Sequence, residues 1–202
     1  MTTEIDFYFD FASPYTYLAY TALPRLAAEH AASIRHHPFG LLDLMKTVGN
    51  RPTTLECAAK GAYAMADLQR WTKIRQVNFA PNPYWTSIDF AELGRGALVA
   101  LDEGRGADYI DAIFSALWEQ SLDLSQRPTL VGVLDAVGFD GAQLLEKAGA
   151  PGYIAKYEKS TARAAERGVF GSPTMFVGAE MFFGNDRLDF VAEALRTDAK
   201  AA

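Results

Sequence analysis

Ser13 occupies a position where its hydroxyl could take part in chemistry at the start of a helix. It lies in residues 10–14 (DFASP), between a predicted strand and a predicted helix. Pro14 is favoured in a first helical turn, where its missing N–H would have had no partner. The free N–H groups and the positive dipole end of a helix N-terminus favour an anion such as a thiolate. Ser13 is therefore a candidate catalytic residue, with a plain N-cap as the alternative.

The dipeptide Ser172–Pro173 stands directly before another predicted strand. A proline at this point is typical of a strand edge, because it has no N–H to donate. Only about 5–6% of X–Pro bonds are cis, but a cis bond here would turn the preceding main chain toward the site. We predict that this bond is cis and that the main chain of Ser172 faces the hydroxyl of Ser13.

A second anion site is predicted where residues 183–186 (FGND) lead into the last helix. An Asn or Asp N-cap after a turn is the simpler interpretation. Alternatively, the helix N-terminus receives a carboxylate while Asp186 holds an ammonium group. One site for a thiolate and another for an amino acid's carboxylate and amine together describe a glutathione pocket. The predicted cofactor residues are Ser13, Ser172, Pro173, Phe183, Gly184, Asn185 and Asp186.

The elements that must position these residues follow the order β-α-β, a helical block, then β-β-α. This order predicts an α/β, thioredoxin-like fold with a large all-helical insertion between its βαβ and ββα halves. We assign 1–40 and 170–202 to the thioredoxin-like domain and 41–169 to the helical insertion domain. The predicted strands are 5–9, 33–39, 174–177 and 181–183. The predicted helices are 14–32, 54–75, 88–103, 107–120, 131–137, 141–148, 151–167 and 187–196, with a frayed tail after them.

Composition and charge exclude several classes of function. The 202 residues carry 19 basic and 25 acidic side chains, a net charge of −6, so the basic surface that nucleic acids or anionic membranes require is not expected. No apolar run approaches the roughly 20 residues that span a bilayer. The first residues carry no basic region followed by an apolar block, so no secretory signal is predicted. A cytoplasmic location is the expectation.

The cysteine and histidines do not suggest a metal or redox centre. A single Cys57 excludes an intramolecular disulfide and a CxxC pair, and we expect it to be a small buried group within a helix. His36 and His37 are adjacent on a strand and face opposite sides, and His30 adds no ligand spacing typical of zinc sites. We therefore predict no metal ion.

Four segments resemble the family of 2-hydroxychromene-2-carboxylate isomerases: 7–14 (FYFDFASP), 67–71 (DLQRW), 169–176 (VFGSPTMF) and 183–188 (FGNDRL). They occur in order over nearly the whole chain, which is far more specific than any one of them. More broadly, the chain is similar to kappa-class glutathione transferases and the DsbA-like thioredoxin superfamily. The resemblance implies a glutathione-dependent isomerase that interconverts 2-hydroxychromene-2-carboxylate and trans-o-hydroxybenzylidenepyruvate in aromatic degradation.

The resemblance also implies roles for individual residues. Ser13 falls beside the glutathione sulfur, the main chain of Ser172 pairs with the glutathione cysteine, and 183–186 hold the γ-glutamyl end. Reversible addition of the thiolate to the conjugated double bond of the substrate turns it into a single bond that rotates. Lys46 falls on the lysine near the substrate carboxylate, and Tyr84 on a tyrosine that contacts the substrate.

This chain departs from the family's pattern mainly on the substrate side. Ser172 replaces a valine before the cis-proline, and Phe182–Phe183 replace two tryptophans. The loop 47–54 is shorter than in the family, which leaves Asn50 and Arg51 as its substrate-binding candidates.

The sequence leaves other functions open. The alternatives are a kappa-like glutathione transferase, an isomerase of another conjugated carbonyl compound, and a catalytically silent glutathione-binding domain. A dithiol oxidoreductase is excluded because residues 13–16 (SPYT) contain no cysteine. The expected partner is a small aromatic carboxylate substrate, and a homodimer is left open.

Overall fold

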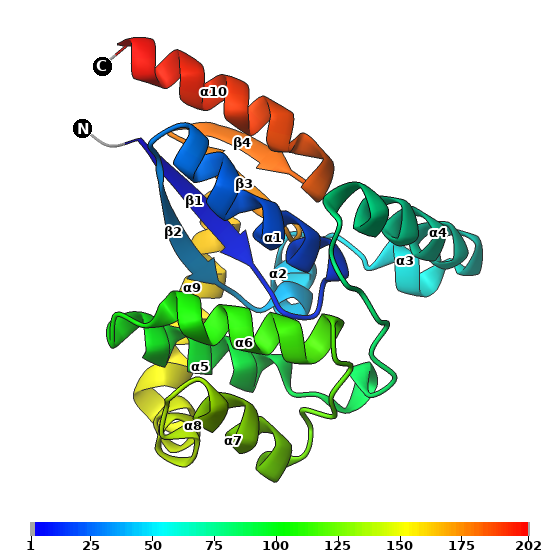
Figure 1. Ribbon diagram of the computed structural model, residues 1–202, viewed down its shortest axis with the longest axis vertical. Helices are drawn as coiled ribbons and strands as arrows, with labels where there is room; N and C mark the ends of the chain where they lie inside the picture. The colour runs from blue at the N-terminus through cyan, green and yellow to red at the C-terminus, as the bar shows by residue number, and fades with distance from the viewer. Residues whose placement is uncertain (1–2, 202) are drawn as a thin grey trace.

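The computed structural model describes residues 3–201 and is built on one four-stranded mixed sheet (Figure 1). The strands are β1 (Glu4–Phe9), β2 (Ser33–Pro38), β3 (Thr174–Val177) and β4 (Glu180–Phe183), in the spatial order β2-β1-β3-β4. β1 pairs in parallel with β2, whereas the β1–β3 and β3–β4 pairs are antiparallel. The predicted α/β fold, with βαβ and ββα halves sharing one sheet, is confirmed.

The two faces of the sheet are covered by different helices. Side chains at alternate positions of β1 point to opposite faces, and Ile5, Phe7 and Phe9 are packed in the cluster that includes α1 (Pro14–Glu29) and α10 (Leu188–Ala201). Tyr8, between them in sequence, belongs to the other cluster, with Leu44. That second cluster joins the sheet to α2 (Leu41–Thr47) and α9 (Pro151–Glu166).

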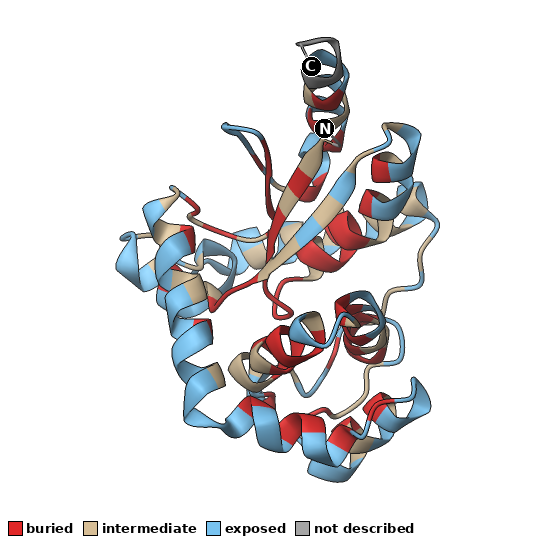
Figure 2. Cartoon of the chain, turned by 90° about the vertical axis from the view of Figure 1, so that its left-hand side faces the viewer, coloured by how far each residue is buried: buried red, intermediate tan, exposed pale blue. Residues whose placement is uncertain are grey.

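The segment between the two halves of the sheet is helical. Its other helices are α3 (Thr53–Glu56), α4 (Ala58–Arg75), α5 (Phe90–Asp102), α6 (Gly106–Trp118), α7 (Arg127–Ala136) and α8 (Gly141–Gly149). Short 3₁₀ turns precede α5 (η1, Trp85–Ser87) and α10 (η2, Asn185–Arg187). Buried residues gather on β1 and β3 and on the inward sides of the helices, while the outer faces of the helices are exposed (Figure 2). α5 and α6 are the helices that carry most of the buried residues of this block.

Several element boundaries differ from the prediction. α2 is not among the predicted helices, because its seven residues are too few for the periodicity of apolar positions to identify a helix. The helix expected over 54–75 is broken at Cys57, which has extended dihedral angles between α3 and α4. Cys57 is also exposed, so its expected burial is wrong. α10 continues to Ala201, beyond the helix predicted for 187–196 and into the expected frayed tail.

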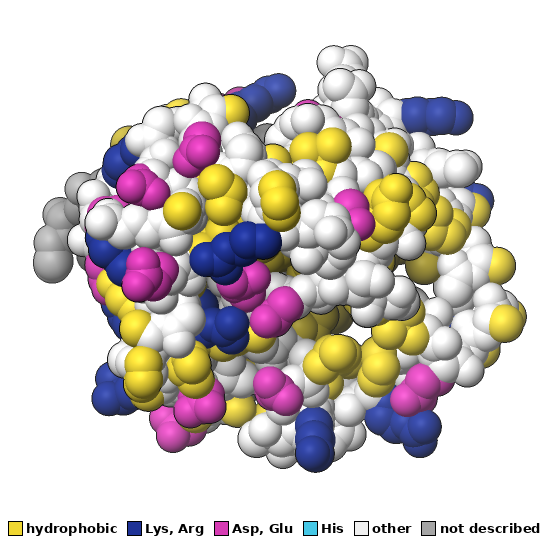
Figure 3. All heavy atoms as spheres, turned by 90° about the horizontal axis from the view of Figure 1, so that it is seen from below, with side chains coloured by type: hydrophobic (Ala, Val, Ile, Leu, Met, Phe, Trp, Pro, Cys, Tyr) yellow, Lys and Arg dark blue, Asp and Glu magenta, His cyan; other side chains and the backbone are white. Residues whose placement is uncertain are grey.

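The surface carries charged side chains of both signs (Figure 3). Basic and acidic side chains lie side by side on the face seen from below, and hydrophobic side chains gather toward the side where α3 and α4 lie (Figure 3). Within residues 3–201, no helix combines the length and apolar character needed to cross a membrane. The same residues contain no group of three or more potential His, Cys, Asp or Glu ligands suited to a metal ion.

Candidate active site

Ser13 is the N-cap of α1, and its side chain faces the cis-proline loop. Its Oγ accepts a hydrogen bond from the N–H of Thr16 at 3.4 Å and donates to the carbonyl of Ser172 at 3.3 Å. The side chain is nearly buried, with 9% of the residue exposed. Ser13 therefore both caps α1 and faces Ser172, as predicted.

The Ser172–Pro173 bond is cis, as predicted. The Oγ of Ser172 lies 2.7 Å from the Oγ1 of Thr16 and accepts from the N–H of Asp10 at 3.1 Å. Among the described residues, the main-chain N–H of Ser172 has no hydrogen-bond partner. An unpaired N–H beside the Ser13 hydroxyl can donate to the backbone of a peptide-like ligand.

Asp10 is hydrogen-bonded to Ser172 through its main-chain N–H and is not among the predicted site residues. Its Oδ1 accepts from the N–H of Ala12 at 2.6 Å, and its Oδ2 accepts from the N–H of Leu41 at 3.0 Å. Burial, opposed in part by these two hydrogen bonds, raises the pKa of Asp10 to about 6. The sequence signal for this residue is a carboxylate directly after the three aromatic residues that end the first strand.

Two tryptophans from the helical segment fix the loop that precedes Ser13. The indole N–H of Trp85 donates to the carbonyl of Ala12 at 2.8 Å, and that of Trp118 donates to the carbonyl of Phe11 at 3.1 Å. Buried indole N–H groups usually find such partners. The position of the Ser13 loop is therefore determined by residues more than 70 positions away in the sequence.

The predicted second anion site is a tight turn between β4 and α10. Gly184 adopts a φ of +104° and donates its N–H to the carbonyl of Pro173 at 3.0 Å. A Cβ at Gly184 would lie 2.5 Å from the Oδ1 of Asp186. Glycine therefore leaves room for this carboxylate and also tolerates the positive φ. Asp186 forms an ion pair with Arg187. The turn and the cis-proline loop are thus hydrogen-bonded neighbours.

Asn185 and Phe183 attach the same turn to the rest of the protein. Asn185 is 3% exposed, and its carbonyl accepts from the guanidinium of Arg75, at the end of α4, at 3.1 Å. The ring of Phe183 lies 4.6 Å from that of Phe170, centroid to centroid. The side-chain N–H groups of Asn185 and the Nε of Arg75 are buried and have no partner within the described part of the chain. Arg75 is a neighbour of the predicted site that the sequence did not indicate.

A small apolar cavity adjoins the start of α1. It has a volume of about 390 Å³ and is lined by Tyr15, Thr54, Ala59, Lys60, Tyr63 and Ala64. The hydroxyl of Tyr15 donates to Asp67 at 3.0 Å, which holds α1 against α4. Burial, together with the carboxylates of Asp67 and Asp186, raises the pKa of Tyr15, so the phenol stays neutral. None of the residues that line this cavity is among the predicted site residues.

The four predicted substrate residues lie on three segments, because Asn50 and Arg51 are neighbours in one loop. Lys46 is exposed in the last turn of α2, and Tyr84 is 43% exposed next to η1. The side-chain amide of Asn50 donates to the carbonyl of Phe170 at 2.7 Å, which ties the 47–54 loop to the cis-proline loop.

Arg51, the fourth predicted substrate residue, already has an ionic partner. Its guanidinium forms an ion pair with Glu56 of α3, with 2.9 Å between Nε and Oε2. Asn50 is hydrogen-bonded to the segment that leads into Ser172, whereas no described contact joins Arg51 to that segment.

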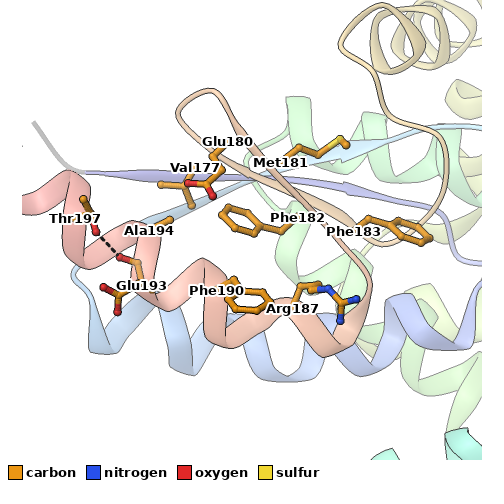
Figure 4. A pocket seen from close by; sticks show the side chains of 10 residues that line it. All are labelled: Val177, Glu180, Met181, Phe182, Phe183, Arg187, Phe190, Glu193, Ala194 and Thr197. Carbon is orange, nitrogen blue, oxygen red and sulfur yellow. Dashed lines mark hydrogen bonds between the residues drawn. The ribbon is translucent and has the colours of Figure 1, made fainter.

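A further cavity, of about 760 Å³, lies between the β3–β4 hairpin and α10 (Figure 4). The rings of Phe182 and Phe190 face each other across it, and Arg187 lies near its end. Phe183 is the one predicted cofactor residue among those that line it. This cavity is therefore distinct from the space beside Ser13 and Ser172.

Comparison with known proteins places these features in a family. Residues 4–196 match the family model of the DsbA-like thioredoxin domain. The chain is 35% identical to the 2-hydroxychromene-2-carboxylate isomerase of Sphingobium xenophagum, over 96% of this chain and 99% of the relative. It is 31% identical to Glutathione S-transferase kappa 1 of Caenorhabditis elegans, over 96% and 91% of the two chains.

A solved structure shows the same similarity in three dimensions. The structure of a 2-hydroxychromene-2-carboxylate isomerase superimposes with a TM-score of 0.88 at 30% sequence identity. The match covers 98% of this chain and 99% of that structure. The likeness thus includes the helical segment as well as the sheet.

Proposed function

Because the chain belongs to the DsbA-like thioredoxin family and, within it, to the family of 2-hydroxychromene-2-carboxylate isomerases, we propose that it is a glutathione-dependent isomerase. The reaction is the interconversion of 2-hydroxychromene-2-carboxylate and trans-o-hydroxybenzylidenepyruvate. The observation that carries the proposal is the hydroxyl of Ser13 at the N-terminus of α1, 3.3 Å from the carbonyl of Ser172 and beside an unpaired main-chain N–H.

The chemistry of the residues around Ser13 fits glutathione. The free N–H and the carbonyl of Ser172 suit pairing with the backbone of its cysteine. The carboxylate of Asp186 and the start of α10 suit its γ-glutamyl ammonium and carboxylate. Asp186 is ion-paired with a neighbouring arginine, so binding would exchange part of this pairing for the ligand. When bound, glutathione supplies a thiolate nucleophile that adds reversibly to a conjugated double bond.

The side chains of this protein would stabilise that thiolate and orient the substrate. The hydroxyl of Ser13 donates to its present acceptor over a long 3.3 Å contact and is free to turn toward a sulfur anion. The N-terminus of α1 adds the positive end of its dipole at the same point. A thiolate is thereby favoured over a thiol, as the proposed addition requires.

The substrate side of the proposal rests on charge and aromatic surface. Lys46 is an exposed cation at the end of α2, suited to hold a carboxylate. Tyr84 and Asn50 are further contacts by family resemblance, whereas Arg51 would first have to leave Glu56. The cavity of about 390 Å³ beside Tyr15 is large enough for an aromatic ring.

A glutathione transferase is the second candidate, favoured by the 31% identity to the kappa-class enzyme of C. elegans. Both functions require the same thiolate site. They differ in the fate of the thiolate after addition, because an isomerase releases it unchanged, whereas a transferase keeps it bonded to the product. Consumption of glutathione therefore separates them.

The test is a spectroscopic assay of the isomerisation with purified protein. Turnover should require glutathione in catalytic amounts, and S-methylglutathione, which has no thiol, should bind without supporting it. Stoichiometric loss of glutathione with a chlorodinitrobenzene would instead favour the transferase. Tight binding of glutathione with no turnover of any conjugated carbonyl compound would leave a silent binding domain and refute the proposal.

A further inference from the structure

Asp10 connects the three segments that form the candidate active site. Its Oδ1 accepts from the N–H of Ala12 at 2.6 Å, in the loop between β1 and α1. Its Oδ2 accepts from the N–H of Leu41 at 3.0 Å, at the start of α2. Its own N–H donates to the Oγ of Ser172 at 3.1 Å, in the cis-proline loop. One nearly buried residue, 5% exposed, thus meets all three.

We infer that the ionised carboxylate of Asp10 is a positioning group for the isomerisation, because it fixes Ser13 relative to Lys46. Ser13 follows the first N–H that Asp10 binds, and Lys46 lies on the helix that begins at the second. The thiolate site and the carboxylate anchor are therefore held at a set distance. This inference rests on the proposed function, which gives those two residues their roles.

The two hydrogen bonds are strongest with the charged form of Asp10. An ionised carboxylate accepts at both oxygens, whereas a protonated one carries an O–H donor at one of them. Two main-chain N–H groups face the two oxygens. Protonation therefore weakens the contact at the oxygen that takes the proton and loosens either the Ser13 loop or the start of α2.

A purely structural role does not explain a carboxylate here. Burial raises its pKa from 3.8 to about 6, and the negative charge of Asp43 on α2 adds to the rise. Tyr157 of α9 also faces Asp10, and its own raised pKa keeps it neutral. The folded chain binds the proton of the Asp10 carboxyl more tightly than the unfolded chain does. The free energy of unfolding therefore decreases as the pH rises from 3.8 to about 6. The charged form is thus present at neutral pH at a cost in stability.

The test compares Asp10→Asn with a matched control, Asp140→Asn. The amide keeps the shape of the side chain but offers one acceptor instead of two. Asp140 caps α8 by accepting from the N–H of Gln143 at 2.9 Å and contacts none of the predicted site residues. For each protein, the melting temperature, kcat, KM for glutathione and bound thiolate absorbance are measured from mildly acidic to mildly alkaline pH.

We expect Asp10→Asn to remain folded while kcat/KM at neutral pH falls about tenfold, equivalent to roughly 1.4 kcal/mol in the barrier. The loss should lie mainly in kcat. Wild-type turnover should decrease as the pH falls through about 6, independently of the thiolate titration, and this decrease should be absent in Asp10→Asn. Asp140→Asn should keep the wild-type pH profile.

Three results would overturn the inference. They are an Asp10→Asn variant with wild-type kcat/KM, a loss of activity that only follows a loss of folded protein, and a wild-type pH profile accounted for by the thiolate alone. The last needs no variant, so it decides the matter even if Asp10→Asn does not fold. A wild type without isomerase activity would refute the proposed function itself, whereas an active wild type matched by Asp10→Asn refutes only the role of Asp10.

Discussion

Replacing Ser13 by alanine tests the proposed thiolate site with little damage to the fold. The Oγ of Ser13 accepts from Thr16 at 3.4 Å and donates to Ser172 at 3.3 Å, both longer than a typical hydrogen bond. Loss of an N-cap costs about 0.5–2 kcal/mol, and long contacts put this case at the lower end of that range. Ser13→Ala should therefore remain folded and keep most of its affinity for glutathione.

The effect on the bound thiol should be larger than the effect on stability. A hydrogen bond to a charged group contributes about 1.5–3 kcal/mol, and one pKa unit corresponds to about 1.4 kcal/mol. Ser13→Ala should therefore raise the pKa of the bound glutathione thiol by about one to two units, toward the roughly 8.5 of a free thiol. At neutral pH, the thiolate fraction, and the turnover with it, should then fall about 8- to 25-fold.

The assay follows the ultraviolet absorbance of the bound thiolate against pH, together with isomerisation rates. Asp140→Ala is the control, because it removes the cap of α8 and should lower stability without shifting the thiolate. Ser13→Cys should form a mixed disulfide with glutathione and isomerise poorly. A Ser13→Ala variant with wild-type turnover and unshifted absorbance would show that the helix terminus suffices and that Ser13 is a cap alone.

Single contacts at three other positions can be tested in the same way. Asp186→Ala should weaken glutathione binding by about 1.5–3 kcal/mol, and unchanged affinity in calorimetry would leave Asp186 with its ion pair to Arg187 alone. Partial burial raises the pKa of Asp6, but side-chain hydrogen bonds, that from His37 first, hold it below 3.8. Its stabilisation is therefore present above that pH and lost in stronger acid, so Asp6→Asn should be destabilised at neutral pH and approach the wild type in acid denaturation. Gly184→Ala should cost about 1–3 kcal/mol because of its φ of +104° and the contact with Asp186. Gly149→Ala, with open space around it, should not lower the melting temperature.

The local sequence was sufficient to predict the order of the elements and the segments of the site. Pro14 after a short apolar strand predicts the start of α1, which the structure has at that residue. Alternating and 3.6-residue patterns depend on neighbours in the chain, so they identify strands and long helices without knowledge of packing. The predicted cis Ser172–Pro173 bond and its opposition to Ser13 are also confirmed, but that prediction depended on the thioredoxin-like order of the elements and not on neighbouring residues.

The short and exposed elements could not be predicted in this way. α2 has seven residues with one buried side chain, and α3 has four with none. Their positions are determined by contacts elsewhere, such as the hydrogen bond from Leu41 to Asp10 and that from Asn50 to Phe170. Cys57 is exposed because the chain bends between two helices there, where the apolar composition of the residue alone predicted burial.

What the sequence determined by itself is therefore the fold class, the family motifs and the three segments that carry Ser13, Ser172 and Asp186. Only the tertiary structure decided how these segments are fixed. Asp10 binds an N–H group 31 positions away, and Trp118 reaches the carbonyl of Phe11 across 107 positions. Such contacts have no local signature, because the distance between two segments depends on how the helices pack on the sheet.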